Sequence, residues 1–139
     1  RGDGVTPYYV NSDFQTKADK GLSDDLYEAA KASGYTVHRG KVWSTDAILR
    51  ETREVIGKAV DGGAIAVDMV TAAFLTICQL KGVPATGILA VSDNVITGEM
   101  GFMDTNYYMS EHAMLTIAVD LIKKREAELA KFRLSFNEH

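Results

Sequence analysis

The sequence predicts an α/β fold in which a mostly parallel sheet is flanked by helices. Short apolar runs alternate with amphipathic helical segments along the 139 residues, which is typical of strands joined by crossover helices. The clearest unit has a strand over 64–67, a helix over about 70–81 and a strand over 86–92. The last run is apolar almost throughout, as expected of a strand covered on both faces. Residues 1–139 are therefore expected to form a single α/β domain portion.

The other expected elements follow from capping and turn signals. Pro7 limits the β-forming run around it to a short edge strand. Ser23 is expected to cap a helix that stops at Gly34, because a serine suits the N-cap and a glycine the position after the last turn. The remaining expectations are a strand over 35–43, a helix capped by Thr45 or Asp46 and running to about Val60, an irregular segment over 94–108 and a long helix from about Ser110 with the apolar stripe Met114, Ile117, Ala118, Leu121 and Ile122.

Composition narrows the class of protein. Hydrophobic residues make up 46% of the chain and the net charge is −4, which suits a packed domain and gives no reason to expect nucleic acid or an acidic membrane as a partner. No apolar run has the roughly 20 residues of a membrane helix. Cys78 is the only cysteine, so it forms neither an internal disulfide nor a metal cluster and is expected to be buried. A cytoplasmic protein is the simplest interpretation.

The beginning of the chain is unusual. It starts with Arg1 in place of methionine, and no helix or strand signal precedes the segment 1–4. We therefore expect a piece that was processed or cut from something longer. An ordinary trimmed boundary is the alternative.

Two acids follow the strands of the central unit. Asp68 comes directly after the strand at 64–67, and Asp93 follows the apolar run at 86–92. Ligands of open α/β sheets bind at the carboxyl ends of strands. Partial loss of hydration there favours a protonated acid, the form a general acid needs. The alternatives are an aspartate that forms a local turn at Asp93, a helix cap at Asp68 and core packing of the neighbouring Met69.

At these residues the chain resembles the nucleoside phosphorylase family that includes uridine phosphorylase, hexameric purine nucleoside phosphorylase and methylthioadenosine nucleosidase. Segments 67–73 and 91–94 are similar to the family's Val-Glu-Met-Glu and Ser-Asp motifs. Segment 43–52 resembles its base-pocket segment, in the form seen in uridine-phosphorylase-like members. Segments 1–4 and 111–113 also fit, so the likeness spans essentially the whole chain in order, with each motif weak when taken singly.

The resemblance implies a nucleoside phosphorylase that uses orthophosphate as co-substrate and needs no cofactor or metal. Asp93 corresponds to the acid that protonates or binds the leaving base, and Ser92 helps to orient it. Met69 corresponds to the methionine under the ribose, and Ile48 stands where the family commonly has a stacking phenylalanine. The implied site residues are Trp43, Ile48, Leu49 and Arg50 for the base, Asp68, Met69 and Val70 for the sugar, and Ser92 and Asp93 for the leaving group.

Two departures bear on activity. Val70 replaces the glutamate that holds the ribose hydroxyls, and loss of such a charged partner costs about 1.5 to 3 kcal/mol. The Gln-x-Arg pair used for uracil is also absent where Thr52 and Glu54 fall, with Arg50 or Arg53 as possible substitutes. A non-catalytic relative and a hydrolytic nucleosidase therefore remain open.

The resemblance also implies partners. The chain matches only the C-terminal half of such an enzyme, and the family's phosphate site lies in the other half. An N-terminal half or second chain is therefore expected to complete the fold. Because members of the family are usually oligomeric, the resemblance also implies a homo-oligomer, from dimer to hexamer. Asp93 favours a purine and the segment at 50–52 favours a uridine-phosphorylase-like enzyme, so the base stays open.

Overall fold

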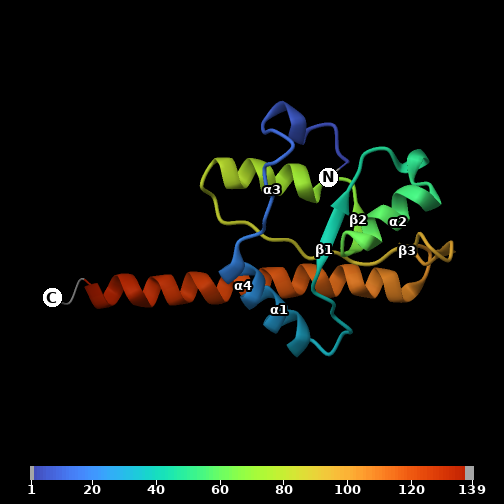
Figure 1. Ribbon diagram of the computed structural model, residues 1–139. Coiled ribbons are helices and arrows are strands. Elements are labelled where there is room, and N and C mark those ends of the chain that lie inside the picture. The colour runs from blue at the N-terminus through green and yellow to red at the C-terminus, as the bar shows by residue number, and fades with distance from the viewer. Residues whose placement is uncertain (1, 137–139) are drawn as a thin grey trace.

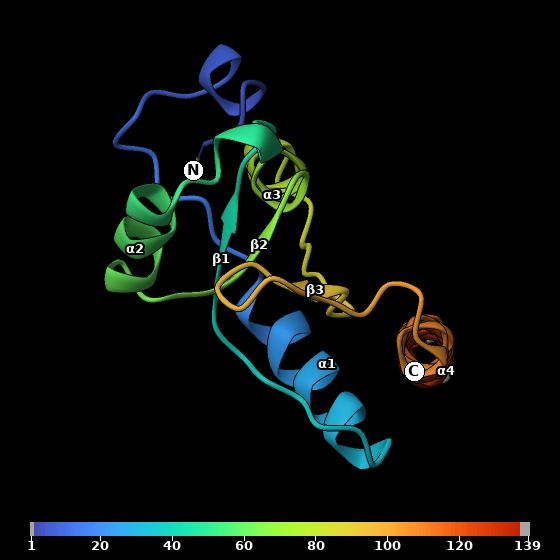
Figure 2. The ribbon, with the colours of Figure 1, turned by 90° about the vertical axis from the view of Figure 1, so that its right-hand side faces the viewer.

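The computed structural model describes residues 2–136, and its centre is a small parallel sheet. The sheet contains β1 (Lys41–Ser44) and β2 (Ala64–Asp68). Figure 2 shows α2 (Arg53–Asp61) and α3 (Thr71–Leu80) on opposite sides of it. In Figure 1 the long helix α4 (Thr105–Phe136) passes below the sheet with α1 (Lys20–Ala32) beside it. The predicted α/β class is confirmed, but the parallel sheet of the described residues is smaller than predicted, with two strands.

The register of the sheet aligns the carboxyl ends of its two strands. Trp43 pairs with Val67 and Ser44 pairs with Asp68. On the other edge of β1 the Gly2 amide donates to the Ser44 carbonyl at 2.7 Å, and Gly2 forms a parallel bridge with Thr45. The prediction of a strand over 64–67 followed by a helix over 70–81 is confirmed. The strand expected over 35–43 begins only at Lys41.

Two helices begin at caps other than the predicted ones. The Asp19 carboxylate accepts a 2.8 Å hydrogen bond from the Leu22 amide and starts α1, so Ser23 lies inside the helix. Thr52 caps α2 by accepting from the Val55 amide at 3.4 Å. Thr45 and Asp46 do not cap it, because η2 (Ile48–Arg50), a 3-10 turn, intervenes. The capping residues are therefore Asp19 and Thr52, and the predicted caps were wrong because residue spacing alone does not show which side chain reaches a free amide.

Two predicted strands are wrong. Residues 5–10 contain η1 (Thr6–Tyr8), a 3-10 turn with Pro7 in its first turn. Residues 86–92 form no strand, because no strand among residues 2–136 lies beside them to accept and donate the hydrogen bonds of a ladder. The segment expected to be irregular instead contains the antiparallel pair β3 (Asp93–Asn94) and β4 (Glu99–Met100), and α4 begins at Thr105, earlier than the predicted Ser110.

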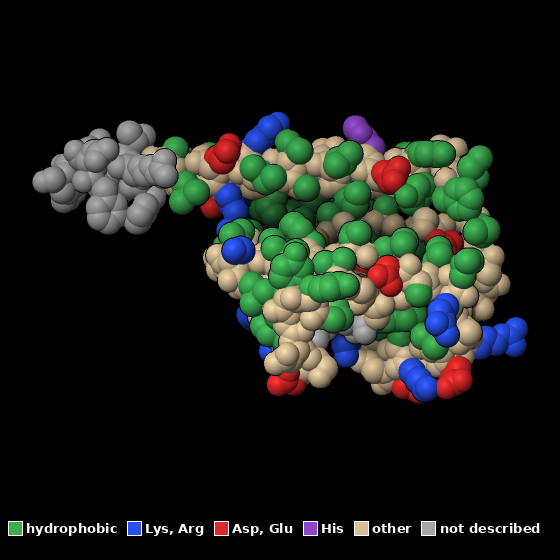
Figure 3. Space-filling model, turned by 90° about the horizontal axis from the view of Figure 1, so that it is seen from above, with side chains coloured by type: hydrophobic (Ala, Val, Ile, Leu, Met, Phe, Trp, Pro, Cys, Tyr) green, Lys and Arg blue, Asp and Glu red, His purple; other side chains and the backbone are tan. Residues whose placement is uncertain are grey.

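The buried apolar core is small, and large apolar side chains are exposed around it. Leu26, Ala30, Ala72 and Leu75 are its buried members, and they come from α1 and α3. The stripe predicted on α4 is half-buried except at its last member, Ile122, which is exposed. Figure 3 shows apolar side chains gathered along the long helix and on the body that faces it. None of the helices in residues 2–136 is long and apolar enough to cross a membrane.

Candidate functional site

The end of β2 is tied to the end of β1 by side chains that also begin α3. Asp68 Oδ1 accepts a 2.5 Å hydrogen bond from Ser44 Oγ, while its Oδ2 accepts from the amides of Val70 at 3.2 Å and Thr71 at 2.7 Å. Ser44 Oγ in turn accepts from the Ala72 amide at 2.9 Å. Two side chains from two strands thus satisfy three of the orphan amides at the start of α3. The contacts of Asp68 support the interpretation in which it caps the helix, although it does so from two positions before the N-cap, Val70, whose side chain makes no capping bond.

These contacts determine the charge state of Asp68. Partial burial by itself raises its pKa, but the hydrogen bonds from Ser44, Thr71 and Val70 outweigh burial and bring the pKa below its ordinary value. Asp68 is therefore an anion at neutral pH, with both oxygens already engaged inside the protein.

Met69 and Val70 lie at the same edge, between Asp68 and α3. Their side chains are 50% and 66% exposed, so the structure does not pack Met69 into the core. The Val70 side chain offers no hydrogen-bonding group at the position where the resemblance places an acid. The edge therefore presents an apolar surface above a carboxylate that is turned inward.

A cavity of about 510 Å³ lies on the other side of the β1 end. Three of the predicted base-pocket residues line it together, namely Trp43, Leu49 and Arg50. Ile48 does not line it. The side chains of Ile48 and of the lining residue Leu49 are 61% and 97% exposed on η2, so this side of the cavity is open to solvent. Most of the lining residues come from the end of β1, from η2 and from the start of α2.

Four further residues line this cavity that the sequence analysis had not placed in the base pocket: Gly2, Thr45, Thr52 and Val55. Thr45 and Thr52 belong to the same segment as the predicted residues, and Val55 lies three positions after Thr52 on α2, so helical spacing was a usable signal. Gly2 carried no such signal, since only the bridge to Thr45 brings it there.

Ser92 and Asp93 lie at the start of the β3–β4 hairpin. Ser92 Oγ donates to Asp93 Oδ1 at 2.5 Å. Asp93 is exposed, so the expected burial at the end of a strand is wrong, because residues 86–92 form no strand. The hairpin instead brings Asp93 into electrostatic contact with Glu51, whose pKa is raised by partial burial and then by repulsion from Asp93.

The structure therefore connects the three predicted segments. Segment 43–52 is joined to the end of β2 through the bond between Ser44 and Asp68, and to the hairpin through Glu51 and Asp93. Glu51 was not predicted as a site residue, and its place between Arg50 and Thr52 was the available signal. Within the described part of the chain, no group of three His, Cys, Asp or Glu side chains is arranged to hold a metal ion.

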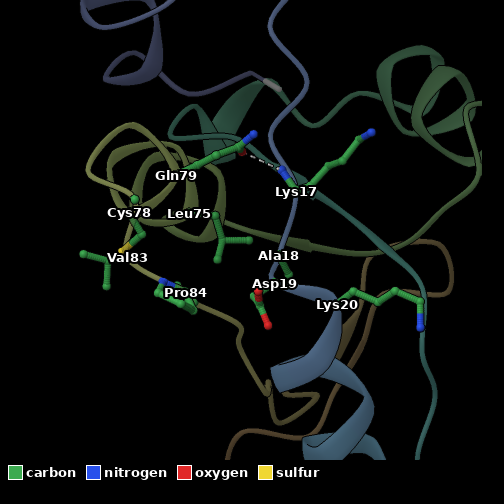
Figure 4. A pocket seen from close by; sticks show the side chains of 11 residues that line it. Lys17, Ala18, Asp19, Lys20, Leu75, Cys78, Gln79, Val83 and Pro84 are labelled. Atoms are coloured by element: carbon green, nitrogen blue, oxygen red, sulfur yellow. Dashed lines mark hydrogen bonds between the residues drawn. The ribbon is translucent and has the colours of Figure 1, made fainter.

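A second cavity, of about 350 Å³, separates the start of α1 from the end of α3. Figure 4 shows Leu75, Cys78, Val83 and Pro84 around it, while the side chains of Lys17 and Lys20 extend away. Cys78 is half-buried, not fully buried as expected. This cavity contains none of the predicted site residues.

Comparisons with known proteins identify the family of the chain. Residues 1–123 match the model of the phosphorylase superfamily. Over 87 residues the chain is 37% identical to DeoD-type purine nucleoside phosphorylases of Bacillus cereus, Bacillus thuringiensis and Bacillus mycoides. Each match covers 63% of this chain and 37% of the relative.

The chain therefore belongs to the phosphorylase superfamily. Its likeness to the DeoD-type enzymes is distant and partial, since it spans little more than a third of their length. The family confirms the resemblance drawn from the motifs. The cavity beside Trp43 and the edge at Asp68 are the candidate site because they contain the residues that the resemblance implies.

Proposed function

We propose that this chain forms part of a nucleoside phosphorylase, which cleaves the N-glycosidic bond of a nucleoside with orthophosphate to give a free base and a pentose 1-phosphate. The observation that carries the proposal is the shared edge of the sheet. The register of Ser44 with Asp68 brings the segment that lines the 510 Å³ cavity next to the segment proposed to lie under the sugar. A cavity of this size falls within the range of small-molecule sites.

In this proposal the base occupies the cavity and the sugar lies over the end of β2. Trp43, Leu49 and Arg50 line the base site, and Ile48 lies at its margin on η2. Met69 packs under the sugar. Asp68 does not bind the substrate, since both of its oxygens are already hydrogen-bonded within the protein. It holds the start of α3, and with it Met69 and Val70, in place. Asp93, oriented by Ser92, donates a hydrogen bond or proton to the base as the C–N bond electrons move onto it, while a phosphate oxygen bonds to the anomeric carbon. Because Asp93 is exposed in this chain, the donating, protonated form requires that the completed site cover it.

Completion of the site requires more than this chain. We propose that an N-terminal half or a second chain supplies the phosphate site and covers the exposed apolar faces, and that the completed protein is a cytoplasmic homo-oligomer. Large exposed apolar side chains, such as Leu115 and Leu129 on α4 and Val91 before β3, support this proposal, because exposed patches of this kind mark interaction surfaces.

The test is base release from a panel of purine and pyrimidine nucleosides by the full-length protein, with and without phosphate. Release that depends on phosphate is the expected result. Release without phosphate would indicate a hydrolytic nucleosidase. If folded protein releases no base from any nucleoside, the enzymatic proposal fails.

A second candidate is a non-catalytic member that binds nucleosides. Two observations favour it: Val70 offers no acid to the ribose hydroxyls, and both oxygens of Asp68 are already bonded. Val70→Glu distinguishes the two candidates. A gain in ribonucleoside cleavage of about tenfold or more, the scale of one charged hydrogen bond, would identify a degenerate site, whereas an active wild type with no such gain would identify a rearranged one.

A further inference from the structure

The long helix α4 has an apolar face that the described chain leaves largely exposed. Four large apolar side chains follow one another along it at intervals of seven residues, and each is at least 55% exposed: Tyr108, Leu115, Ile122 and Leu129. Residues seven apart lie almost in line along a helix, because seven residues make nearly two turns. We call these four residues the α4 seam. An apolar repeat of seven residues is typical of a helix that packs against another helix.

The α4 seam continues past the point where the helix leaves the rest of the molecule. Arg125 donates to Asp25 on α1, and residues 126–130, which follow it, are all exposed. Figure 1 shows this end of α4 extending beyond the other elements. The match to the phosphorylase superfamily ends at residue 123, so Leu129 lies outside the matched part of the chain. A helix without tertiary contacts is marginal in water, which favours a partner for this end that the matched domain does not include.

The spacing of the α4 seam is the same from either end, so the seam can pair with itself. In an antiparallel pair of α4 helices related by a two-fold axis, Leu115 lies opposite Ile122 of the second copy, and Tyr108 lies opposite Leu129 of the second copy. A single axis midway between Leu115 and Ile122 therefore matches all four residues. Val119, which is also exposed, lies next to that axis and opposite its own copy.

Charges beside the α4 seam favour the antiparallel direction. His112 and Glu126 are exposed and lie four residues after Tyr108 and Ile122, on one side of the seam. An antiparallel pair places the His112 imidazole opposite the Glu126 carboxylate of the second copy, where a hydrogen bond can join them. A parallel pair would place each Glu126 beside its own copy, and the two like charges would repel each other.

We propose that the α4 seam is the interface between two copies of this chain, packed antiparallel about a two-fold axis between Leu115 and Ile122. The proposal rests on the homo-oligomer proposed above and deepens it by naming its surface and its symmetry. It assigns the α4 seam to a second copy and leaves the unpaired segment 86–92 to the part of the protein that completes the fold. It requires no cleavage of nucleosides.

Light scattering and sedimentation of the full-length protein over a range of concentrations test the proposal. We expect an oligomer with an even number of copies. Ile122→Glu places a carboxylate against Leu115 of the second copy in both halves of the interface, and it should raise the dissociation constant at least about 30-fold, the scale of an interface hot spot. Ala127→Glu is the matched control, because it adds the same group at an exposed position about 140° around the helix from Ile122.

The double variant Leu115→Lys with Ile122→Glu tests the direction of the helices. In the antiparallel pair each new carboxylate lies opposite a new ammonium group, so the double variant should recover most of the affinity that Ile122→Glu loses. A parallel pair would bring like charges together and recover nothing. Absence of recovery would therefore overturn the antiparallel interface.

Thermal unfolding separates loss of the interface from loss of the fold. If Ile122→Glu does not fold, Leu129→Glu decides, because Leu129 lies outside the matched domain on the exposed end of α4. A full-length monomer would overturn the proposal, as would an oligomer that neither substitution weakens more than Ala127→Glu does. Base release is measured separately: a seam-dependent oligomer that releases no base supports the interface while the enzymatic proposal fails, and base release by a monomer does the reverse.

Discussion

At the scale of single residues, the side chains of Asp68 and Ser44 join two strands to one helix. Each oxygen of Asp68 is engaged, one with Ser44 Oγ and the other with the Val70 and Thr71 amides. Such a carboxylate cannot turn to a ligand without exposing amides that it now satisfies. Its role in the site is therefore to fix the edge on which Met69 and Val70 lie.

Asp68→Ala should lower the free energy of unfolding by about 1 to 2 kcal/mol, the usual cost of losing a helix cap. Because the pKa of Asp68 is lowered in the folded protein, its contribution is present above the ordinary carboxyl pKa and is lost as the pH falls through the folded value. Urea unfolding of wild type and Asp68→Ala at neutral and at acid pH measures the loss of stability and its dependence on pH. Asp120→Ala, an exposed position on α4, is the control, and equal stability of Asp68→Ala and wild type at neutral pH would contradict the assignment.

The contact between Glu51 and Asp93 predicts an opposite dependence on pH. Burial and repulsion by Asp93 raise the pKa of Glu51, so its favourable contribution is present below the ordinary pKa and is lost as the pH rises through the folded value. Glu51→Gln should therefore raise the melting temperature at neutral pH more than at acid pH. Asp93→Asn should reproduce part of the gain. An equal effect of Glu51→Gln at both pH values would refute the raised pKa, and an Asp93→Asn variant with no gain would refute the contact.

At the scale of elements, the boundaries of the helices depend on local backbone geometry. Gly82 follows α3 with φ of +65°, and Gly34 follows α1 with φ of +82°. This left-handed conformation is available to glycine at little cost and is how many helices end. These two endings confirm the sequence prediction. The predicted beginnings of α1 and α2 were wrong, because the first residue of a helix depends on which side chain reaches a free amide.

Gly82→Ala should destabilise the protein by about 1 kcal/mol, because alanine pays a steric penalty in the left-handed region. An added Cβ would meet no atom within 4 Å at this position, so backbone conformation alone carries the effect. Gly87→Ala is matched, since its Cβ also meets nothing and its φ is not in that region. Urea unfolding of both variants checks the difference, and equal losses would point to another cause.

At the scale of the whole molecule, the buried core is small and many large apolar side chains are exposed, and both features are expected if another part of the protein packs against this chain. Residues 86–92 have the sequence of a buried strand, yet Leu89 and Val91 are 45% and 75% exposed. None of the backbone amides of 87–91 donates a hydrogen bond to a backbone partner within residues 2–136. A strand sequence in this condition predicts that another part of the assembled protein pairs with it.

Hydrogen exchange in the full-length protein tests that pairing. The amides of 87–91 should exchange more slowly than those of the exposed loop at 35–39, on the order of 100-fold, because opening a paired strand costs free energy. The loop serves as an internal reference, since its amides also lack backbone partners in the described chain. Rapid exchange in both segments would contradict a covered strand.

Local patterns were sufficient for several parts of the molecule. The apolar run at 64–67, the helix that follows it and the glycines that end α1 and α3 are set by neighbours in the chain, and the motifs around them identified the family. Trp43, Leu49 and Arg50 were predicted together because segment 43–52 resembles the family's base-pocket segment, and all three line the cavity.

Contacts between distant segments decided the rest. Residues 86–92 needed a neighbouring strand that residues 2–136 do not supply. The sequence by itself determined the α/β class, the family and the segments that make up the site. Only the tertiary structure decided that Asp68 faces inward, that Gly2 lines the cavity and that Glu51 meets Asp93, because hydrogen bonds and charge contacts between remote residues leave no local pattern.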